Sequence, residues 1–232
     1  MIRLDKLLSE MGAGSRKEVT KYIRSGSVSV NGEIIKAPDT KVQESADIIC
    51  MGEKIKYKQY FYIMLNKPQG YVTATKDNVN PTVLELIDDE LLRKRVSPAG
   101  RLDIDTEGFV FLTDDGPLNH KITGPKGHVR KRYYVELEKP LSEEQKDRLE
   151  NGVTLDDGYL TKPAKMEIIN GHSCYLDLWE GKFHQVKRMF AAVSNKVIYL
   201  KRTIIGSLPL DENLEPGQYR EITDEELELL WT

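Results

Sequence analysis

Several features that define other classes of protein are scarce or absent in this sequence of 232 residues. It contains two cysteines, Cys50 and Cys174, which cannot cross-link a chain of this length, so we expect reduced thiols in a cytoplasmic protein. No apolar run approaches the length of a membrane span, and residues 1–5 do not begin a secretory leader. The four histidines do not have the spacing of a metal site: His120, His128, His172 and His184. A disulfide scaffold, a membrane protein and a histidine-based metal site are therefore not expected.

The chain has a charged surface and enough apolar residues for a core. Charged residues make up 31% and hydrophobic residues 39%, which suits one large or two smaller globular domains. The net charge of -3 is unevenly distributed, because residues 211–232 hold 8 acidic and 1 basic residue. Residues 1–60 hold 11 basic and 8 acidic residues, and residues 61–210 hold 22 and 21. The overall negative charge therefore does not exclude a nucleic-acid-binding surface.

The first part of the chain has the pattern of a small helical module. Apolar residues at helical spacing predict a short helix over residues 4–11. Ser15 and Glu18 form the sequence pattern of a capping box, which predicts a second helix over residues 16–25. An Asn-Gly turn between two short apolar stretches predicts a hairpin over residues 27–35.

Basic residues are concentrated on the polar faces of this module, and their number suggests a surface that faces phosphates. They are Arg3, Lys6, Arg16, Lys17, Lys21 and Arg24. The order of helix, SRxxV helix and SGxVxVNG hairpin resembles the S4 RNA-binding domain over about residues 1–48. The resemblance implies an RNA helix or loop bound on the second helix. We therefore expect an S4 domain with linker over residues 1–58 and a catalytic domain over residues 59–232.

The larger domain mixes strand and helix patterns without a regular βαβ repeat. This mixture predicts an α+β fold built on a mixed, largely antiparallel sheet flanked by helices. We expect strands at 61–66, 109–113, 132–137, 166–169 and 174–178, and helices at 81–95, 143–151, 185–193 and after 223. The segment 114–116 is most simply a turn.

One glycine-bounded loop, residues 100–108, has an unusual density of polar residues directly before an apolar strand. It holds Arg101, Asp103, Asp105 and Thr106. Aspartates in loops often serve turns only, but this density indicates a reactive carboxylate at the end of a buried strand. Asp103 is the candidate.

Two further segments supply what a reactive carboxylate needs. Residues 180–190 place cations at the start of a helix, and a nearby cation keeps a carboxylate ionised. Residues 131–135 carry tyrosines, which can stack on a flat heterocycle and move a proton. The residues alone leave two points open: Tyr133 could be a core residue, and spacing does not separate Lys187 from Arg188.

The motifs GRLDIDTEGFVFLTDDG, K-x-Y-x-V and EGKFHQVKRMFAAV occur in this order, and with the S4 pattern they resemble the RsuA-type pseudouridine synthases over the whole chain. The resemblance implies that Asp103 is the nucleophile, that the uracil detaches and that it reattaches through carbon. It implies that Tyr133 stacks on the uracil and assists proton removal, and that Lys187 pairs with the nucleophile. Arg101 would fill the space left by the flipped base. No metal or cofactor is implied, because the isomerisation is redox-neutral.

Other residues near these motifs receive weaker roles. His184 is expected to be structural or to contact RNA, and Lys67 to contact the RNA backbone or simply to be solvated. Asp105 and Thr106 are expected to shape the catalytic loop by hydrogen bonds.

The resemblance also implies a substrate, namely uridine 516 of 16S ribosomal RNA. We expect the enzyme to be a monomer and to modify this RNA in an assembly intermediate of the small subunit. Alternatives are the same chemistry on a 23S ribosomal RNA uridine, or a non-catalytic RNA-binding or ribosome-assembly protein that keeps the fold. A hydrolase using Asp103 and Asp105 as paired carboxylates is a further alternative, but neither a second catalytic partner nor a phosphate-binding loop is evident.

Overall fold

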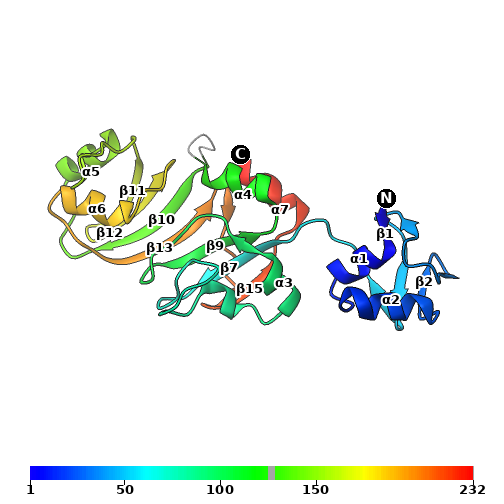
Figure 1. Cartoon of the computed structure of the whole chain (residues 1–232). Helices are drawn as coiled ribbons and strands as arrows, with labels where there is room; N and C mark the ends of the chain where they lie inside the picture. Colours follow the sequence, from blue (N-terminus) through cyan, green and yellow to red (C-terminus); the bar gives the residue numbers. More distant parts are fainter. Residues whose placement is uncertain (125–128, 232) are drawn as a thin grey trace. The chain divides into compact units, whose positions relative to one another are not determined.

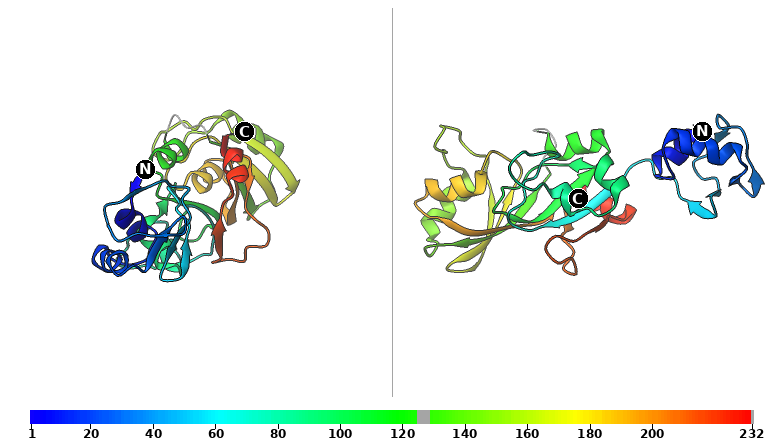
Figure 2. Two further views of the ribbon diagram at one scale, coloured as in Figure 1. Left: turned by 90° about the vertical axis from the view of Figure 1, so that its right-hand side faces the viewer. Right: turned by 60° about the horizontal axis from the view of Figure 1, so that its bottom comes forward.

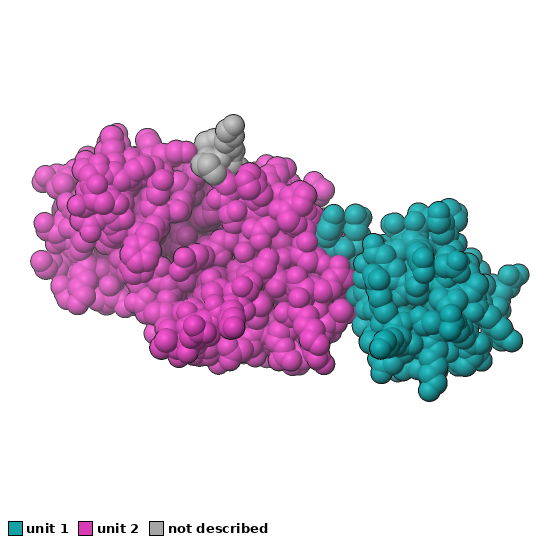
Figure 3. Space-filling model, viewed as in Figure 1, with its two compact units in different colours: residues 1–60 teal, residues 61–232 magenta. Residues whose placement is uncertain are grey.

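The computed structural model describes residues 1–124 and 129–231. The chain forms two compact units, residues 1–60 and residues 61–232, which are distinguished by colour in Figure 3. No helix in the described parts is both long and apolar enough to cross a membrane. Cys50 is buried in the first unit and Cys174 in the second, and neither is part of a disulfide.

The first unit consists of two helices and small antiparallel sheets. Its helices are α1 (Leu4–Glu10) and α2 (Arg16–Arg24). A four-stranded sheet has the order β3-β2-β5-β6, with β2 at Val28–Val30, β3 at Glu33–Ile34, β5 at Ile48–Cys50 and β6 at Glu53–Ile55. A further pair joins β1 (Ile2–Arg3) to β4 (Lys41–Val42).

The predicted start of α2 has the expected physical basis. The Ser15 side chain accepts a hydrogen bond from the Glu18 backbone N–H, and the Glu18 carboxylate accepts one from the Ser15 backbone N–H at 2.8 Å. These two bonds satisfy N–H groups that the first turn leaves without a partner. Val19 and Ile23 of α2 are fully buried, and they pack with apolar residues of α1 into the core of this unit.

The second unit is built on one large sheet (Figure 1). In the described residues nine strands belong to it, in the order β11-β12-β10-β13-β9-β7-β15, with β14 paired to β13 and β8 to β9. The strands are β7 (Tyr62–Lys67), β8 (Ser97–Pro98), β9 (Glu107–Thr113), β10 (Lys131–Leu137), β11 (Lys165–Asn170), β12 (Ser173–Leu178), β13 (Val197–Ile205), β14 (Leu208–Pro209) and β15 (Tyr219–Glu221). The pair β9–β13 is parallel and the other pairs are antiparallel. The expected mixed, largely antiparallel sheet is confirmed.

Helices flank this sheet. They are η1 (Val83–Leu86), α3 (Glu90–Arg95), α4 (Gly116–Thr123), α5 (Glu143–Asn151), α6 (Gln185–Ala192), α7 (Asp224–Glu228) and η2 (Leu229–Trp231). Helices α5 and α6 lie together near the end of the sheet that carries β11 and β12 (Figures 1 and 2). Strand β9 runs through the interior, and its residues Phe109 to Leu112 are fully buried on both faces.

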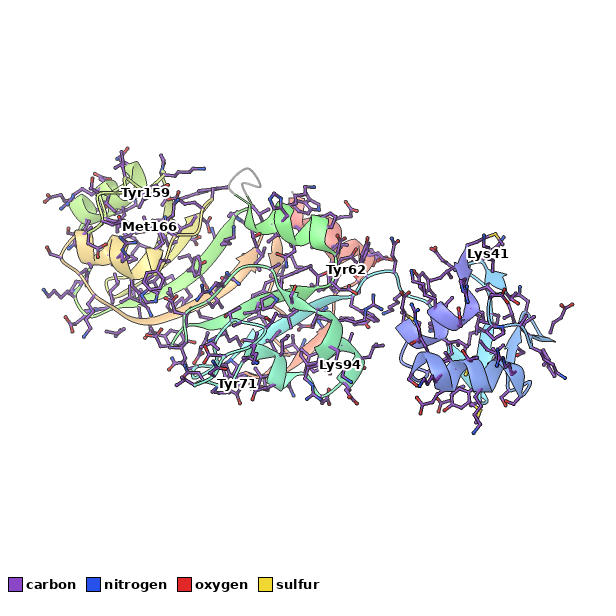
Figure 4. The ribbon with its side chains drawn as sticks, in the orientation of Figure 1. Lys41, Tyr62, Tyr71, Lys94, Tyr159 and Met166 are labelled. Carbon is purple, nitrogen blue, oxygen red and sulfur yellow. The ribbon has the colours of Figure 1, made fainter. Side chains whose placement is uncertain are left out.

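Two local predictions are wrong. The expected helix over 81–95 is interrupted, because Ile87 has an extended backbone and Asp89 begins α3 by accepting a hydrogen bond from the Leu92 N–H at 2.9 Å. The expected turn at 114–116 is the start of α4, since the Asp115 carboxylate accepts a hydrogen bond from Leu118 N–H at 3.0 Å. The same carboxylate accepts a hydrogen bond from the hydroxyl of Tyr62, labelled in Figure 4, so α4 is tied to β7.

Candidate active site

A cavity of about 450 Å³ opens between the catalytic-loop residues 100–106, one face of the sheet and the loop 180–184. Its lining includes two of the three residues predicted to act in catalysis, Asp103 and Tyr133, and two predicted to contact RNA, Arg101 and His184. The sequence motifs that are far apart along the chain therefore meet at one place.

The catalytic loop is held to its surroundings mainly through its backbone. The Leu102 N–H donates to Thr73 Oγ1 at 3.1 Å, and Thr73 Oγ1 donates to the Leu102 carbonyl at 2.9 Å. The Gly70 N–H donates to the Ile104 carbonyl at 2.8 Å. These bonds fix the backbone on both sides of Asp103.

Lys67 also holds this loop, and the expectation that it contacts the RNA backbone is wrong. Its side chain is fully buried. The Nζ group donates to the carbonyls of Thr106 at 2.7 Å and Ile104 at 3.3 Å, and to that of Pro68 at 3.0 Å. Burial lowers the pKa of Lys67 to about 8, although the charges of Asp105 and Asp103 act in the opposite direction.

Asp103 lies between two basic side chains. Its Oδ1 is 3.5 Å from His184 Nε2, and its Oδ2 is 3.5 Å from Lys187 Nζ. The Asp103 side chain is 24% exposed, which leaves the carboxylate accessible from the cavity. A carboxylate held by a cation and open to a cavity is suited to act as a nucleophile.

Lys187 lies closer to a second carboxylate. Its Nζ is 2.5 Å from Asp105 Oδ1 and thus bridges Asp105 and Asp103. Burial raises the pKa of Asp105, but the hydrogen bond and charge of Lys187 outweigh it, so the pKa is lowered overall. The neighbouring Arg188 instead pairs with Asp156 and Asp157. The structure thus places Lys187, and not Arg188, beside Asp103.

The expected hydrogen bonds of Asp105 and Thr106 are found only in part. The Thr106 N–H donates to the Asp103 carbonyl at 3.0 Å. The Thr106 hydroxyl is buried and has no hydrogen-bond partner in the described parts of the chain. Thr106 therefore shapes the loop through its backbone, whereas Asp105 contributes through its ion pair with Lys187.

Tyr133 is both a strand residue and a lining residue. It is 8% exposed and borders the cavity. Its neighbours across the sheet are Leu176 of β12 and Arg202 of β13. Adjacent strand residues point to opposite faces, and Tyr134 accordingly packs edge-on against Tyr175 and Tyr199. Tyr133 is therefore both a buried residue of the sheet and a residue that lines the cavity.

Two basic residues that line the cavity were not anticipated. Arg202 is 2% exposed, and its Nε donates to the Phe109 carbonyl at 2.7 Å while Nη1 lies 3.4 Å from the Arg101 carbonyl. Its Nη2 has no hydrogen-bond partner in the described residues. Burial, with a contribution from Arg202, lowers the pKa of Lys131 to about 8. The K-x-Y motif contains Lys131, but no sequence signal marked Arg202, because a charged residue in an alternating strand is usually exposed.

The loop before α6 is rigidly built around Gln185, which is 4% exposed. Gln185 Nε2 donates to Glu180 Oε1 at 2.6 Å, and Gln185 Oε1 accepts from the Lys182 N–H at 2.8 Å. His184 has φ 49°, in the left-handed region. Its ring stacks on that of Phe183, with centroids 3.7 Å apart and planes inclined by 20°.

The predicted RNA-contacting residues of the first unit and the wedge candidate Arg101 are all exposed. Arg3 pairs with Asp5 at 2.8 Å, and Lys6 pairs with Glu10 at 3.5 Å. The remaining four lie on or at the start of α2 and form no ion pair with the described residues: Arg16, Lys17, Lys21 and Arg24.

The described residues contain no group of three or more His, Cys, Asp or Glu side chains that could hold a metal ion. His128, one of the four histidines considered from the sequence, lies outside the described residues.

Comparison with known proteins agrees with this geometry. Residues 61–192 match the family model of RNA pseudouridylate synthase, and residues 2–48 match that of the S4 domain. The chain is 47% identical to an uncharacterized RNA pseudouridine synthase of Bacillus subtilis, over 99% of this chain and 98% of the relative. It is 43% identical to ribosomal small subunit pseudouridine synthase A of Escherichia coli, over 97% and 98% of the two chains. A crystal structure of a pseudouridylate synthase, 42% identical, superposes with a TM-score of 0.71 over 99% of this chain and 100% of the other.

Proposed function

This chain belongs to the RNA pseudouridylate synthase family, and we propose that it converts one uridine of small-subunit ribosomal RNA, uridine 516 of the 16S molecule, to pseudouridine. The observation that carries the proposal is that Asp103 and Tyr133 line one cavity, with Lys187 Nζ 3.5 Å from the Asp103 carboxylate. A cavity of about 450 Å³ is large enough for a flipped nucleoside.

In the proposed reaction Asp103 is the nucleophile, and its attack allows the bond between the uracil nitrogen and the ribose to break. The detached uracil turns within the cavity, and a ring carbon bonds to the ribose in place of the nitrogen. The bond that Asp103 formed in its attack then breaks, which regenerates the free carboxylate. The carbon loses its proton and the nitrogen gains one, so atoms and electrons balance without an oxidant or cofactor. Lys187 supports Asp103 as its cation, at 3.5 Å from the carboxylate.

The surrounding residues suit the other steps of this proposal. Tyr133 is buried and lines the cavity, where its ring can stack on the uracil and its hydroxyl can assist proton removal. Arg101 is exposed at the rim, where it can enter the base stack that the target uridine leaves. His184 contacts Asp103 at 3.5 Å and so belongs to the same cluster.

The choice of substrate rests on the relatives and on the S4 domain. Relatives from Yersinia pestis, Haemophilus influenzae and Escherichia coli that are 43% to 44% identical over nearly the whole chain are named for the small ribosomal subunit. The exposed basic face of α2 provides contacts to RNA phosphates. We infer that the protein acts as a monomer on an assembly intermediate of the subunit.

The mechanism is tested by replacing Asp103 with asparagine, which removes the nucleophile while it preserves size. We expect Asp103→Asn to fold, to bind RNA and to form no pseudouridine in a single-turnover assay on 16S ribosomal RNA. Asp147→Asn makes the same chemical change at an exposed position of α5 that does not line the cavity, and we expect this control to retain turnover. Wild-type activity of Asp103→Asn would remove Asp103 from its proposed role.

The substrate is tested by mapping pseudouridine in ribosomal RNA from cells that lack the protein. Loss of the modification at uridine 516 alone is expected. Loss at a 23S uridine instead would support the alternative target, and an unchanged map together with a ribosome-assembly defect would support the non-catalytic alternative.

A further inference from the structure

We propose that Phe183, backed by His184, is a stacking platform for an unpaired nucleobase that flanks the target uridine. The inference rests on the proposed function only in taking RNA as the ligand. It adds a second base-binding site at the rim of the cavity, separate from the part of the cavity that Tyr133 lines.

The exposure of Phe183 is the first observation. The side chain is 70% exposed, although one face of its ring is covered by His184 at 3.7 Å between centroids. The opposite face is therefore the part that meets solvent. A phenyl ring with one face open to solvent offers a flat apolar surface on which a planar ligand can stack.

The second observation is that hydrogen bonds hold the backbone of the loop that carries this ring. The Phe183 carbonyl accepts a hydrogen bond from Arg188 Nη1 at 3.2 Å. The buried Gln185 closes the loop through its bonds to Glu180 and Lys182. A platform that is already ordered loses little entropy when a base stacks on it.

The third observation is the distance to the chemistry. The His184 ring stacks on the Phe183 ring, and His184 Nε2 lies 3.5 Å from Asp103 Oδ1. A uridine whose sugar reaches Asp103 therefore brings the next nucleotide of its strand to the rim, where Phe183 lies. The same rim carries positive charge from the exposed Arg101 and Lys182, which suits the connecting phosphate.

An unpaired base fits this platform better than a phosphate or an aliphatic group. Single-stranded RNA is commonly bound by stacking of its bases on aromatic side chains, and every base offers a flat face. The platform has no side-chain donor or acceptor that would read one base, so it is expected to accept all four bases and to bind purines more tightly than pyrimidines.

The inference is tested with a double-mutant cycle between the protein and the RNA. The protein carries Asp103→Asn so that binding is measured without turnover, and the RNA is a 16S fragment that contains uridine 516. Stacking of one base contributes about 1–3 kcal/mol, so Phe183→Ala should weaken binding by about 5- to 150-fold. Phe183→Trp should bind as well as the parent protein, and Phe183→Leu, apolar but without an aromatic face, should resemble Phe183→Ala.

The RNA side of the cycle uses an abasic nucleotide placed in turn on either side of the target. At one of these two positions, the abasic nucleotide should weaken binding to the parent protein as much as Phe183→Ala weakens binding to intact RNA. Combining the abasic nucleotide with Phe183→Ala should then cause no further loss of affinity. Equal losses from Phe183→Ala on every RNA, or no loss at all, would overturn the platform. Formation of pseudouridine by a protein without the Asp103 change is scored separately, so failure of the platform and failure of the proposed function are distinguishable.

Discussion

A buried lysine, Lys67, connects strand β7 to the loop that carries Asp103. Its ammonium group donates to the carbonyls of Ile104 and Thr106, on the far side of Asp103 from the bonds made by Thr73. The loop is thus held from two sides, and the Asp103 carboxylate is left with only modest freedom to move. In the proposed mechanism, preorganisation of this kind would keep the carboxylate in position for attack on the substrate.

Because Lys67 is buried, its protonation is coupled to folding. Its pKa is about 8 in the folded protein, below the ordinary value of 10.5, so the folded state binds this proton more weakly than the unfolded state does. Burial of the charged Lys67 therefore lowers the free energy of unfolding. This effect is fully present below pH 8 and disappears as the pH rises towards 10.5. We therefore expect the free energy of unfolding of the wild type to increase relative to that of Lys67→Met between pH 8 and pH 10. Urea unfolding of both proteins measures this difference, and a constant difference across the window would contradict it.

The sequence predicted some residues of the site and missed others for a physical reason. Asp103 was identifiable because the polar loop and apolar strand around it are local in sequence. The roles of Lys67 and Arg202 depend on pairing between strands: Lys67 faces Gly108 across β7–β9, and Arg202 faces the same glycine across β13–β9. The spacing of residues along the sequence does not show that distant strands bury a charged side chain. Lys67 and Arg202 therefore resembled solvated residues.

At the scale of elements, the parallel pair of β9 and β13 positions the catalytic loop. Gly108 stands at the start of β9 with φ +99°, and a Cβ placed there would overlap the Arg202 carbonyl and lie 2.9 Å from the Arg202 N. Both strands thus approach closely just where Arg202 passes beneath the loop. A residue with a side chain cannot occupy this position without moving one strand.

Gly108→Ala tests this close approach. The substitution combines an unfavourable left-handed backbone with a clash against backbone atoms, so we expect it to lower the free energy of unfolding by more than about 2 kcal/mol. Gly116→Ala is the matched control, because no atom lies within 4 Å of the added Cβ and the backbone there is not left-handed. Equal stability of the two variants in urea unfolding would show that β9 can move away from β13 at little cost.

Elements were predicted best where their signals were local. The capping box of Ser15 and Glu18 marked the start of α2, and the apolar run after Gly108 marked β9. Helical spacing alone failed over 81–95, because Asp89 starts a new helix inside the apolar pattern. Strand β13 was missed altogether, since its central residues Lys201 and Arg202 are charged and its pairing with β9 and β10 is long-range.

At the scale of the whole molecule, the chain forms two units with separate cores, and we propose that the first contributes to RNA binding while the second carries the chemistry. The first has a core of its own formed by α1, α2 and the small sheet, and the second contains the cavity. The order of motifs along the sequence was the basis for predicting two domains, because each carries its own local pattern. The path of the strands in the large sheet could not be predicted from such patterns, because it depends on pairings between residues up to about 160 positions apart.

If the first unit supplies much of the phosphate contact, its charge should control the salt dependence of RNA binding. Each phosphate contact contributes about 0.7 to 0.9 to the slope of log affinity against log salt. Replacing the four basic residues of the α2 face (Arg16, Lys17, Lys21 and Arg24) with glutamine should therefore weaken binding to 16S ribosomal RNA and reduce the slope by up to about 3. Deletion of residues 1–58 should reduce it at least as much.

The control removes charge elsewhere without removing a phosphate contact. Lys94 pairs with Glu90 and Lys196 with Glu138, and both lysines are exposed in the second unit. The double variant Lys94→Gln, Lys196→Gln should keep the wild-type slope. A slope that is unchanged by the α2 variant, or one that falls equally in the control, would show that the S4 unit contributes no specific phosphate contacts, and the basic residues of α2 would then be an ordinary solvated helix face.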